Sequence, residues 1–218
     1  MRFRDRTHAG KMLGERLRSR YTGRQDLLVL GLPRGGVPVA YEVARALDAP
    51  LDVFVVRKLG VPGHEELAMG ALASGGVLVL NRDLIERLGI DDQAVARTVA
   101  SERAELARRE RAYRGHRGGP VDVAGKTVIL VDDGLATGST MRAAASAIRA
   151  QGPERLVVAV PVGARQTCEQ LRDEVDEIEC TLTPEPFAAV GLWYEDFAAT
   201  EDGEVRELLA RAETAVMP

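Results

Sequence analysis

Two adjacent acids, Asp132 and Asp133, follow the apolar run at residues 128–131 and precede a small, polar segment at 134–140. An ordinary connection between a strand and a helix needs one turn-forming residue and one cap, so this segment is longer than a structural role requires. Small residues that enter a helix direct several backbone N–H groups at one point, and the helix N-terminus adds partial positive charge. The segment therefore predicts a phosphate-binding loop made of Ala136, Thr137, Gly138, Ser139 and Thr140.

The two acids indicate what else the ligand carries. Two carboxylates would repel a bare phosphate, so we expect Asp132 and Asp133 to address a neutral or cationic group beside it. A ribose diol offers two neighbouring O–H donors and suits two adjacent carboxylates, which predicts a site for a ribose 5-phosphate. The simpler interpretation, a helix cap and a solvated acid, needs only one acid, and Thr137 or Ser139 could serve as that cap. The Walker A lysine and the G-x-G-x-x-G fingerprint are both absent.

Two further segments carry residues suited to bind anions. The first is PRGG at residues 33–36, and the second is the pair Arg57-Lys58, which ends the apolar run at 51–58. By itself PRGG is typical of a plain tight turn, and beside DDGLATGST it favours anion binding. The two cations are equally compatible with ordinary charges at the end of a strand.

The elements that must position these residues alternate between strands and helices. Strands are expected at 27–30, 51–58, 127–131, 155–160 and 175–181, and helices at 5–21, 37–47, 139–150, 164–173 and 202–211. This alternation predicts an α/β fold with a mainly parallel sheet flanked by helices. Ligands of such sheets bind outside the carboxyl ends of the strands, where all three segments fall.

A different kind of sequence lies between the second and third strands. We expect a Gly/Pro loop at 59–63, a hairpin about the turn at 74–76, and a charged helical segment at 81–117 that ends at Gly118-Gly119-Pro120. The narrow apolar face of the helical segment consists of Val95, Val99, Leu106 and Tyr113. Interleaved Glu residues favour a solvated face for its basic run, 103–117, and a subunit contact or an RNA surface is the alternative. A mobile polar loop is expected to contain His64, Glu65 and Glu66.

Composition excludes several classes of protein. The chain has 29 basic and 33 acidic residues, a net charge of −4, so bulk electrostatics do not indicate nucleic acid. No apolar run reaches the roughly 20 residues of a membrane span, and the N-terminal segment lacks the apolar stretch of a signal peptide. Cys168 and Cys180 form no CxxC pair, which favours a reduced, cytoplasmic protein. The segment HEEL at His64 is not HExxH, so no zinc site is predicted.

The segment VILVDDGLATGST resembles the signature of the type I phosphoribosyltransferases (PRTases), which bind phosphoribosyl pyrophosphate (PRPP) through an apolar strand, two acids and a phosphate loop. The resemblance implies a Rossmann-like core in a single domain, 1–218, with an insertion at about 62–118 and a hood at about 182–200. LPRGG is similar to the family's pyrophosphate loop, which often contains a strained non-proline peptide, and RK resembles the orotate-type members. The implied pyrophosphate ligands are Pro33, Arg34, Gly35, Gly36, Arg57 and Lys58.

The chain as a whole most resembles a bacterial group of phosphoribosyltransferases of unassigned acceptor. The resemblance implies Mg²⁺-dependent transfer of 5-phosphoribosyl from PRPP to a nitrogenous acceptor, with a nucleobase favoured, and release of pyrophosphate. It implies a place in nucleotide and nucleoside metabolism. Mg²⁺ would be held mainly through PRPP, with Asp132 and Asp133 as further ligands. The implied catalytic residues are Asp133, as a base for the acceptor, with Asp132, Arg34 and Lys58.

The resemblance also implies an acceptor site and an assembly. Aromatic residues gather in the hood, and Trp193 or Tyr194 would stack on the acceptor. The protein would act as a homodimer with small-molecule partners and would contact neither a membrane nor nucleic acid.

Two alternatives stay open at this point. A PRPP- or nucleotide-sensing regulator on the same fold would keep the signature, because sensing also needs PRPP, but would not need the leaving-group segments PRGG and RK. An unrelated phosphosugar-binding α/β protein would make those two segments coincidental. Purine, pyrimidine and non-nucleobase amine acceptors all remain open.

Overall fold

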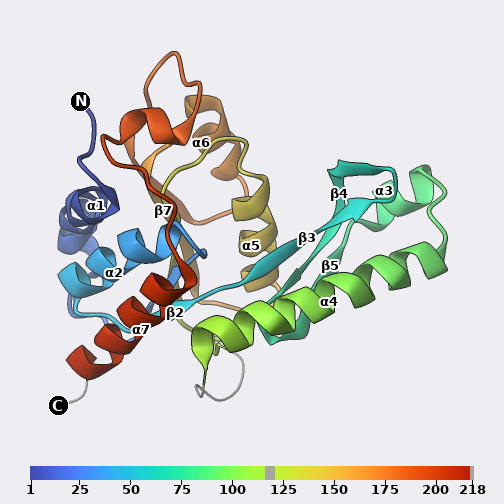
Figure 1. Cartoon of the computed structure of the whole chain (residues 1–218), viewed down its shortest axis with the longest axis horizontal. Helices are drawn as coiled ribbons and strands as arrows, with labels where there is room; N and C mark the ends of the chain where they lie inside the picture. The colour runs from blue at the N-terminus through green and yellow to red at the C-terminus, as the bar shows by residue number, and fades with distance from the viewer. Residues whose placement is uncertain (116–120, 217–218) are drawn as a thin grey trace.

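The computed structural model describes residues 1–115 and 121–216, and a five-stranded parallel sheet lies at its centre (Figure 1). The strand order is β2-β1-β6-β7-β8, and every neighbouring pair is parallel. The strands are β1 (Leu27–Gly31), β2 (Leu51–Val53), β6 (Thr127–Val131), β7 (Arg155–Val162) and β8 (Glu177–Leu182). All residues of β1 and β6 are buried, as expected for strands covered on both faces. The predicted α/β class and parallel sheet are confirmed.

Helices cover both faces of this sheet. Alternate residues of β6 point to opposite faces, so Ile129 and Val131 pack with α1, α2 and α7, whereas Val128 and Leu130 pack with α5 and α6. The helices are α1 (Arg6–Tyr21), α2 (Gly36–Leu47), α5 (Ser139–Arg149), α6 (Arg165–Leu171) and α7 (Asp202–Val216). The carboxylate of Asp5 accepts a hydrogen bond from the backbone N–H of His8 and so caps the N-terminus of α1.

A second, antiparallel sheet extends away from the first (Figure 1). It consists of β3 (Val56–Val61), β4 (His64–Ala73) and β5 (Val77–Leu80), and α3 (Arg82–Arg87) and α4 (Asp92–Arg114) follow it. We call residues 56–114 the arm. The predicted apolar face of α4 is confirmed, because Val95, Leu106 and Tyr113 are buried and Val99 packs against the same core.

Two sequence predictions in this region are wrong. The strand predicted at 51–58 is divided, because the backbone leaves the parallel sheet after the bond from Phe54 N–H to the carbonyl of Gly31. Val55 then exchanges hydrogen bonds with Ser74, which starts the pairing of β3 with β4. The loop predicted at 59–63 is also wrong, since the ladder continues until Val61 faces His64. Apolar patterning does not reveal which sheet a strand joins.

The remainder of the arm follows the sequence more closely. The predicted hairpin is confirmed, and its turn is the short 3₁₀ helix η1 (Ser74–Gly76). The charged helical segment at 81–117 is two helices, separated near Gly89, whose φ is 62°. The predicted end at Gly118-Gly119-Pro120 lies outside the described residues. Of the helices that can be described, none combines the length and apolarity needed to cross a membrane.

Candidate functional site

The PRGG segment lies against the two acids at the carboxyl ends of β1 and β6. A Cβ on Gly36 would lie 2.7 Å from the carbonyl oxygen of Val131 and 2.9 Å from Cα of Asp132. A Cβ on Gly35 would lie 2.1 Å from Oδ2 of Asp133, so only glycine permits this approach. The peptide bond between Pro33 and Arg34 is cis. Segments about one hundred residues apart in the chain therefore form one contact.

The predicted phosphate loop joins β6 to α5, beside the end of β7. Leu135 donates its N–H to the carbonyl of Val162, and the hydroxyl of Thr167 donates to the carbonyl of Ala136. Gly138 has a φ of 74° and directly precedes α5. The segment therefore leads directly into α5. The first N–H groups of a helix have no partner within the helix, and this arrangement favours the binding of an anion.

The hydroxyl groups of the loop lie around this helix terminus. Thr137 and Thr140 are exposed, and the Thr137 and Ser139 hydroxyl oxygens are 3.3 Å apart. The loop therefore presents hydroxyl donors beside the backbone donors of the helix terminus, and its binding of a phosphate stays a prediction.

The two carboxylates are only partly exposed and differ in their surroundings. The guanidinium Nε of Arg6 donates to Oδ2 of Asp133 over 2.8 Å, and 16% of the Asp133 side chain is exposed. Oδ1 of Asp132 accepts a hydrogen bond from the backbone N–H of Asp133. Burial raises the pKa of the Asp132 carboxyl well above its ordinary value, and the charge of Asp133 raises it further. Burial also raises the pKa of Asp133, while Arg6 opposes that shift.

Sequence reasoning missed Arg6, which is 127 residues from Asp133 along the chain. It lies in the first turn of α1, in no recognisable motif. The hydroxyl of Tyr194 also reaches this acid and donates to the backbone carbonyl of Asp133.

The three cationic side chains predicted to bind pyrophosphate lie in three different environments. Arg34 is about half exposed, and its Nη1 is 3.7 Å from the carboxylate of Asp202 at the start of α7. Arg57 donates from Nε to Glu102 of α4 over 2.6 Å. Lys58 lies on the other face of the arm sheet, because successive residues of a strand alternate.

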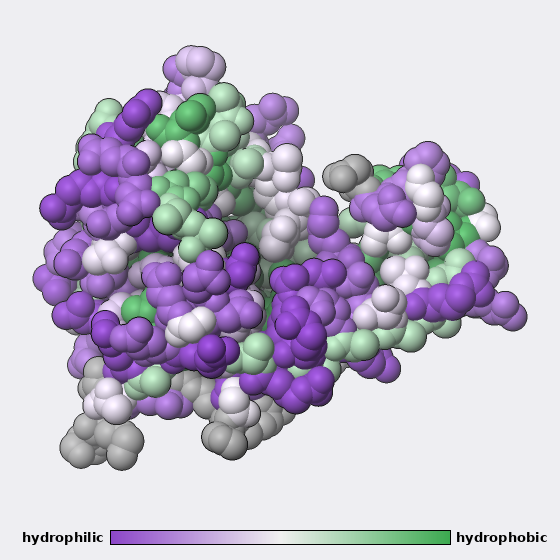
Figure 2. Space-filling view, viewed as in Figure 1, coloured by the Kyte–Doolittle hydropathy of each residue, from purple (hydrophilic) through white to green (hydrophobic). Residues whose placement is uncertain are grey.

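The two faces of β3 adjoin different parts of the protein. Ala71 is opposite Lys58 and lines a cavity of about 390 Å³ between the arm and α5, together with Ser139 and Arg142. Figure 2 shows a hollow between the arm and the rest of the molecule. The joint placement predicted for Arg57 and Lys58 at the end of a core strand is therefore wrong. Only Lys58 is on the face that adjoins the phosphate loop.

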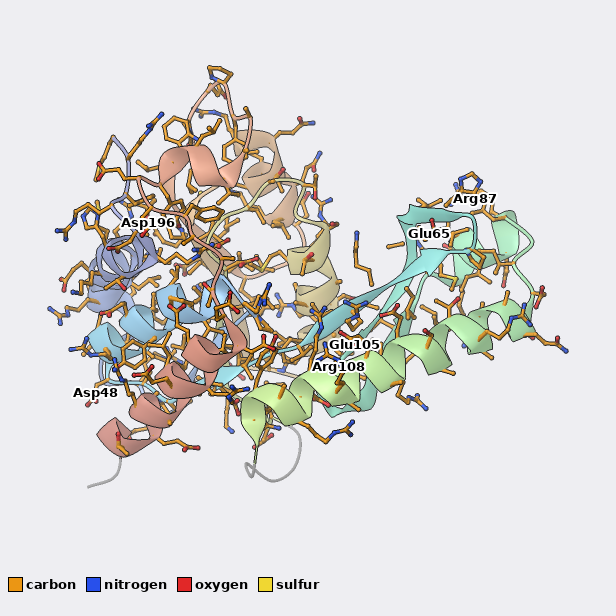
Figure 3. All side chains as sticks on the ribbon, viewed as in Figure 1. Asp48, Glu65, Arg87, Glu105, Arg108 and Asp196 are labelled. Atoms are coloured by element: carbon orange, nitrogen blue, oxygen red, sulfur yellow. The ribbon has the colours of Figure 1, made fainter. Side chains whose placement is uncertain are left out.

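His64 and Glu65, expected in a mobile polar loop, are exposed residues of β4. Figure 3 shows Glu65 toward the outer end of the arm. The predicted solvated face of the charged helix is confirmed at Glu105, which pairs with Arg108 and Arg109 one turn away.

The hood contributes one prediction that the structure corrects. Tyr194 follows the 3₁₀ helix η2 (Val190–Trp193) and is only 4% exposed, with its ring 5.5 Å from Phe3 and 4.9 Å from Phe197. Burial raises the pKa of its phenol. A ring enclosed in this way does not offer a face to an acceptor, so Tyr194 supports Asp133 instead.

The other hood prediction concerns Trp193, which is partly buried. Its indole nitrogen Nε1 is covered and finds no hydrogen-bond partner among the residues that the structure describes. Val190 packs on Gly134 of the phosphate segment, where a Cβ would lie 2.4 Å away. The hood thus closes directly over the loop that follows the two acids.

The family profile described as Phosphoribosyl transferase domain matches residues 6–194. The chain belongs to the phosphoribosyltransferase family. The match includes Arg6, the PRGG segment, the two acids and the phosphate loop. The predicted family and fold are therefore confirmed.

Two further comparisons place the PRTase chain among its relatives. It is 45% identical over 210 residues to a Mycobacterium tuberculosis protein named "Putative phosphoribosyl transferase Rv0571c", covering 96% of this chain and 47% of the relative. The chain thus spans about half the length of the curated relatives it matches. The crystal structure of TT1426 from Thermus thermophilus is 45% identical, with a TM-score of 0.87 over 97% of this chain and 99% of that one.

A more distant structure shares the fold alone. A hypothetical protein from Neisseria gonorrhoeae, solved with bound ppGpp, is 14% identical with a TM-score of 0.50, over 97% of this chain and 98% of that one.

Proposed function

We propose that this PRTase binds PRPP and transfers its 5-phosphoribosyl group to a nitrogenous acceptor, with a nucleobase favoured, releasing pyrophosphate. The observation that supports the proposal most is the contact of Gly35 and Gly36 with Asp133 and Asp132, beside the start of α5. A loop suited to pyrophosphate, two diol acceptors and a phosphate loop then share one edge of the sheet.

In the proposed complex each part of PRPP has its own group of ligands. Backbone N–H groups and hydroxyls of residues 136–140 bind the 5-phosphate. Asp132 and Asp133 accept hydrogen bonds from the ribose hydroxyls and so fix the orientation of the sugar. Because Arg6 already engages Oδ2 of Asp133, we propose that Asp133 orients the ribose rather than acting as the base.

The leaving group is stabilised by the PRGG segment and two cations. Departure of pyrophosphate from C1 breaks the C1–O bond and leaves an oxocarbenium-like sugar, as in glycoside cleavage. The backbone amides of residues 33–36, with Arg34 and Lys58, stabilise the charge that develops on pyrophosphate. Arg34 is exposed and only loosely paired with Asp202, so its guanidinium is able to turn to the ligand. The acceptor nitrogen then forms the new bond to C1.

Mg²⁺ belongs to this proposal. Mg²⁺ in phosphate-binding sites is held by one or two carboxylates together with substrate oxygens, rather than by a cage of protein ligands. The pair Asp132 and Asp133 suits that arrangement, and the described part of the chain has no group of three or more His, Cys, Asp or Glu residues that could hold a metal. When bound, the ion would neutralise charge on the pyrophosphate and ribose oxygens.

The proposal is tested by measuring pyrophosphate release from PRPP with Mg²⁺ across a panel of purines, pyrimidines and simple amines. Asp132→Asn and Asp133→Asn are each expected to lower kcat/KM by about 100-fold or more. Asp122→Asn is the matched control, because Asp122 is exposed, pairs with the nearby Lys126 and accepts a hydrogen bond from the backbone N–H of Ala124, away from the site. The proposal would be contradicted if the wild-type protein did not bind PRPP under any of the conditions tested.

A sensor of PRPP or of a nucleotide is the second candidate. Arg57 pairs with the carboxylate of Glu102 instead of facing the site, which leaves fewer cations to stabilise departing pyrophosphate and favours a site that retains its ligand. Wild type that binds PRPP, yet releases no pyrophosphate with any acceptor, would establish this candidate. We also propose a homodimer in a reducing cytoplasm, in keeping with two free cysteines; sedimentation measures the dimer.

A further inference from the structure

We propose that Arg6 is a positioning residue of the PRPP site, which holds the carboxylate of Asp133 in one orientation and connects it to the hood. The inference rests on the proposed function, because it concerns the acid that would bind the ribose. It adds a residue from outside the motif segments to that site.

Arg6 and Gly35 both lie against one oxygen of the Asp133 carboxylate, Oδ2. Nε of Arg6 donates to Oδ2 over 2.8 Å, and the two side chains are 13% and 16% exposed. Gly35 lies against the same oxygen, because a Cβ on Gly35 would lie 2.1 Å from Oδ2 and 3.3 Å from Nε of Arg6. Oδ2 is therefore engaged, and Oδ1 is the oxygen left to accept from a ribose hydroxyl.

Arg6 is itself held by the hood. Its Nη1 donates to the carbonyl of Ala198 over 2.7 Å, and its Cζ lies 4.0 Å from the centroid of the Phe197 ring. The ring of Phe197 packs in turn against Gly191, where a Cβ would lie 2.9 Å away. A planar guanidinium that both stacks and donates in two directions has little freedom to rotate.

The hood and the N-terminal segment form one unit around Asp133. Phe3 donates its N–H to the carbonyl of Trp193, and Glu195 donates to the carbonyl of Phe3, both over 2.8 Å. Figure 1 shows the N-terminal segment beside this part of the chain. Since Tyr194 donates to the backbone carbonyl of Asp133, the unit holds both the main chain and the side chain of the acid.

Loss of Arg6 should lower the rate by changing the position of the Asp133 carboxylate. A displacement of about 1 Å in a group that orients a substrate is enough to lower a rate by about 100-fold. Gln at position 6 would lose the charge and the stacking, whereas Lys would keep a charge without the planar fork. We therefore expect a graded loss: largest in Arg6→Gln, smaller in Arg6→Lys.

The experiment measures kcat/KM for pyrophosphate release and the affinity for PRPP with Mg²⁺ by calorimetry. Arg6→Gln is expected to lower kcat/KM by about 100-fold, and Arg6→Lys to recover part of that loss. Arg4→Gln is the matched control, because Arg4 is an exposed arginine two residues away, and it should behave as wild type. Full activity and affinity in Arg6→Gln would overturn the proposal.

A double-mutant cycle separates positioning from a general structural role. If Arg6 acts through Asp133, then in the Asp133→Asn background the Arg6→Gln change should alter kcat/KM by no more than about twofold. If the fold-losses in kcat/KM of the two single variants multiply in the double variant, the two residues act independently and the proposal is overturned. Should Arg6→Gln not fold, Arg6→Lys carries the same cycle. Wild type that neither binds PRPP nor releases pyrophosphate contradicts the proposed function, whereas multiplicative losses in a PRPP-binding protein contradict only the role of Arg6.

Discussion

Gly35 and Asp133 approach each other so closely that a Cβ on Gly35 would lie 2.1 Å from Oδ2 of Asp133. The PRGG segment and the acid pair are therefore one packed unit, and the space between them is sized for a hydrogen atom. The same carboxylate oxygen also accepts from Arg6.

Gly35→Ala should push this unit apart. Overpacking of this kind costs about 1–3 kcal/mol in stability, and the displaced acid should lower PRPP affinity by about tenfold or more. Urea unfolding and calorimetry with PRPP measure the two effects. Gly203→Ala is the control, because the nearest atom to its added Cβ is 3.9 Å away. Equal PRPP affinity in Gly35→Ala and wild type would show that the contact is not needed.

Arg57 and Lys58 should behave differently despite being neighbours. Lys58→Gln is expected to lower kcat/KM for pyrophosphate release by about 100-fold, because it removes a charge from the face beside α5. Arg57→Gln breaks a partly exposed ion pair with Glu102, which should change stability by less than about 1 kcal/mol and leave kcat/KM close to wild type. Steady-state kinetics decides between them, and the reverse ranking would contradict the assignment.

Tyr194→Phe should weaken the support of Asp133. The change removes only the hydroxyl that donates to the Asp133 carbonyl, so we expect a loss of about 1 kcal/mol in the free energy of unfolding. Tyr41→Phe, in α2, is the control tyrosine. A Tyr194→Phe variant as stable as wild type would show that this hydroxyl does not support Asp133.

Asp132 should make stability depend on pH in an unusual direction. Burial raises the folded-state pKa of its carboxyl above the ordinary 3.8, so the folded protein keeps a proton that the unfolded chain has lost. The unfolding free energy should therefore fall as pH rises from about 3.8 through the raised pKa. Asp132→Asn removes this effect and is expected to be more stable than wild type at pH 7.

The check is urea unfolding at pH 4 and pH 7. The stability advantage of Asp132→Asn should grow between the two values, while Asp122→Asn, at an exposed acid, should show no such gain. An Asp132→Asn variant that is less stable than wild type at pH 7 would mean that this carboxylate holds the fold together.

Some elements could be predicted closely because their causes are local. The apolar run at 127–131 and the helix that begins at Ser139 both match the structure, since patterning and the small residues before the helix act within a few residues. The family signature is of the same kind, because its strand, acids and loop are contiguous. In contrast, the run at 51–58 is apolar throughout, and its division between two sheets depends on Ser74, which pairs with Val55.

By itself the sequence determined the α/β class and the PRTase signature, and it supplied the hypothesis that three segments bind PRPP, because each follows from residue types at short spacing. Only the tertiary structure decided that Arg57 turns to α4, that Tyr194 is enclosed, and that Arg6 reaches Asp133. These are contacts between residues far apart in the chain, such as the 127 positions between Arg6 and Asp133, and they form only when the sheet and its helices pack. Local patterning carries no information on such pairings, since the same side chains would satisfy many other partners.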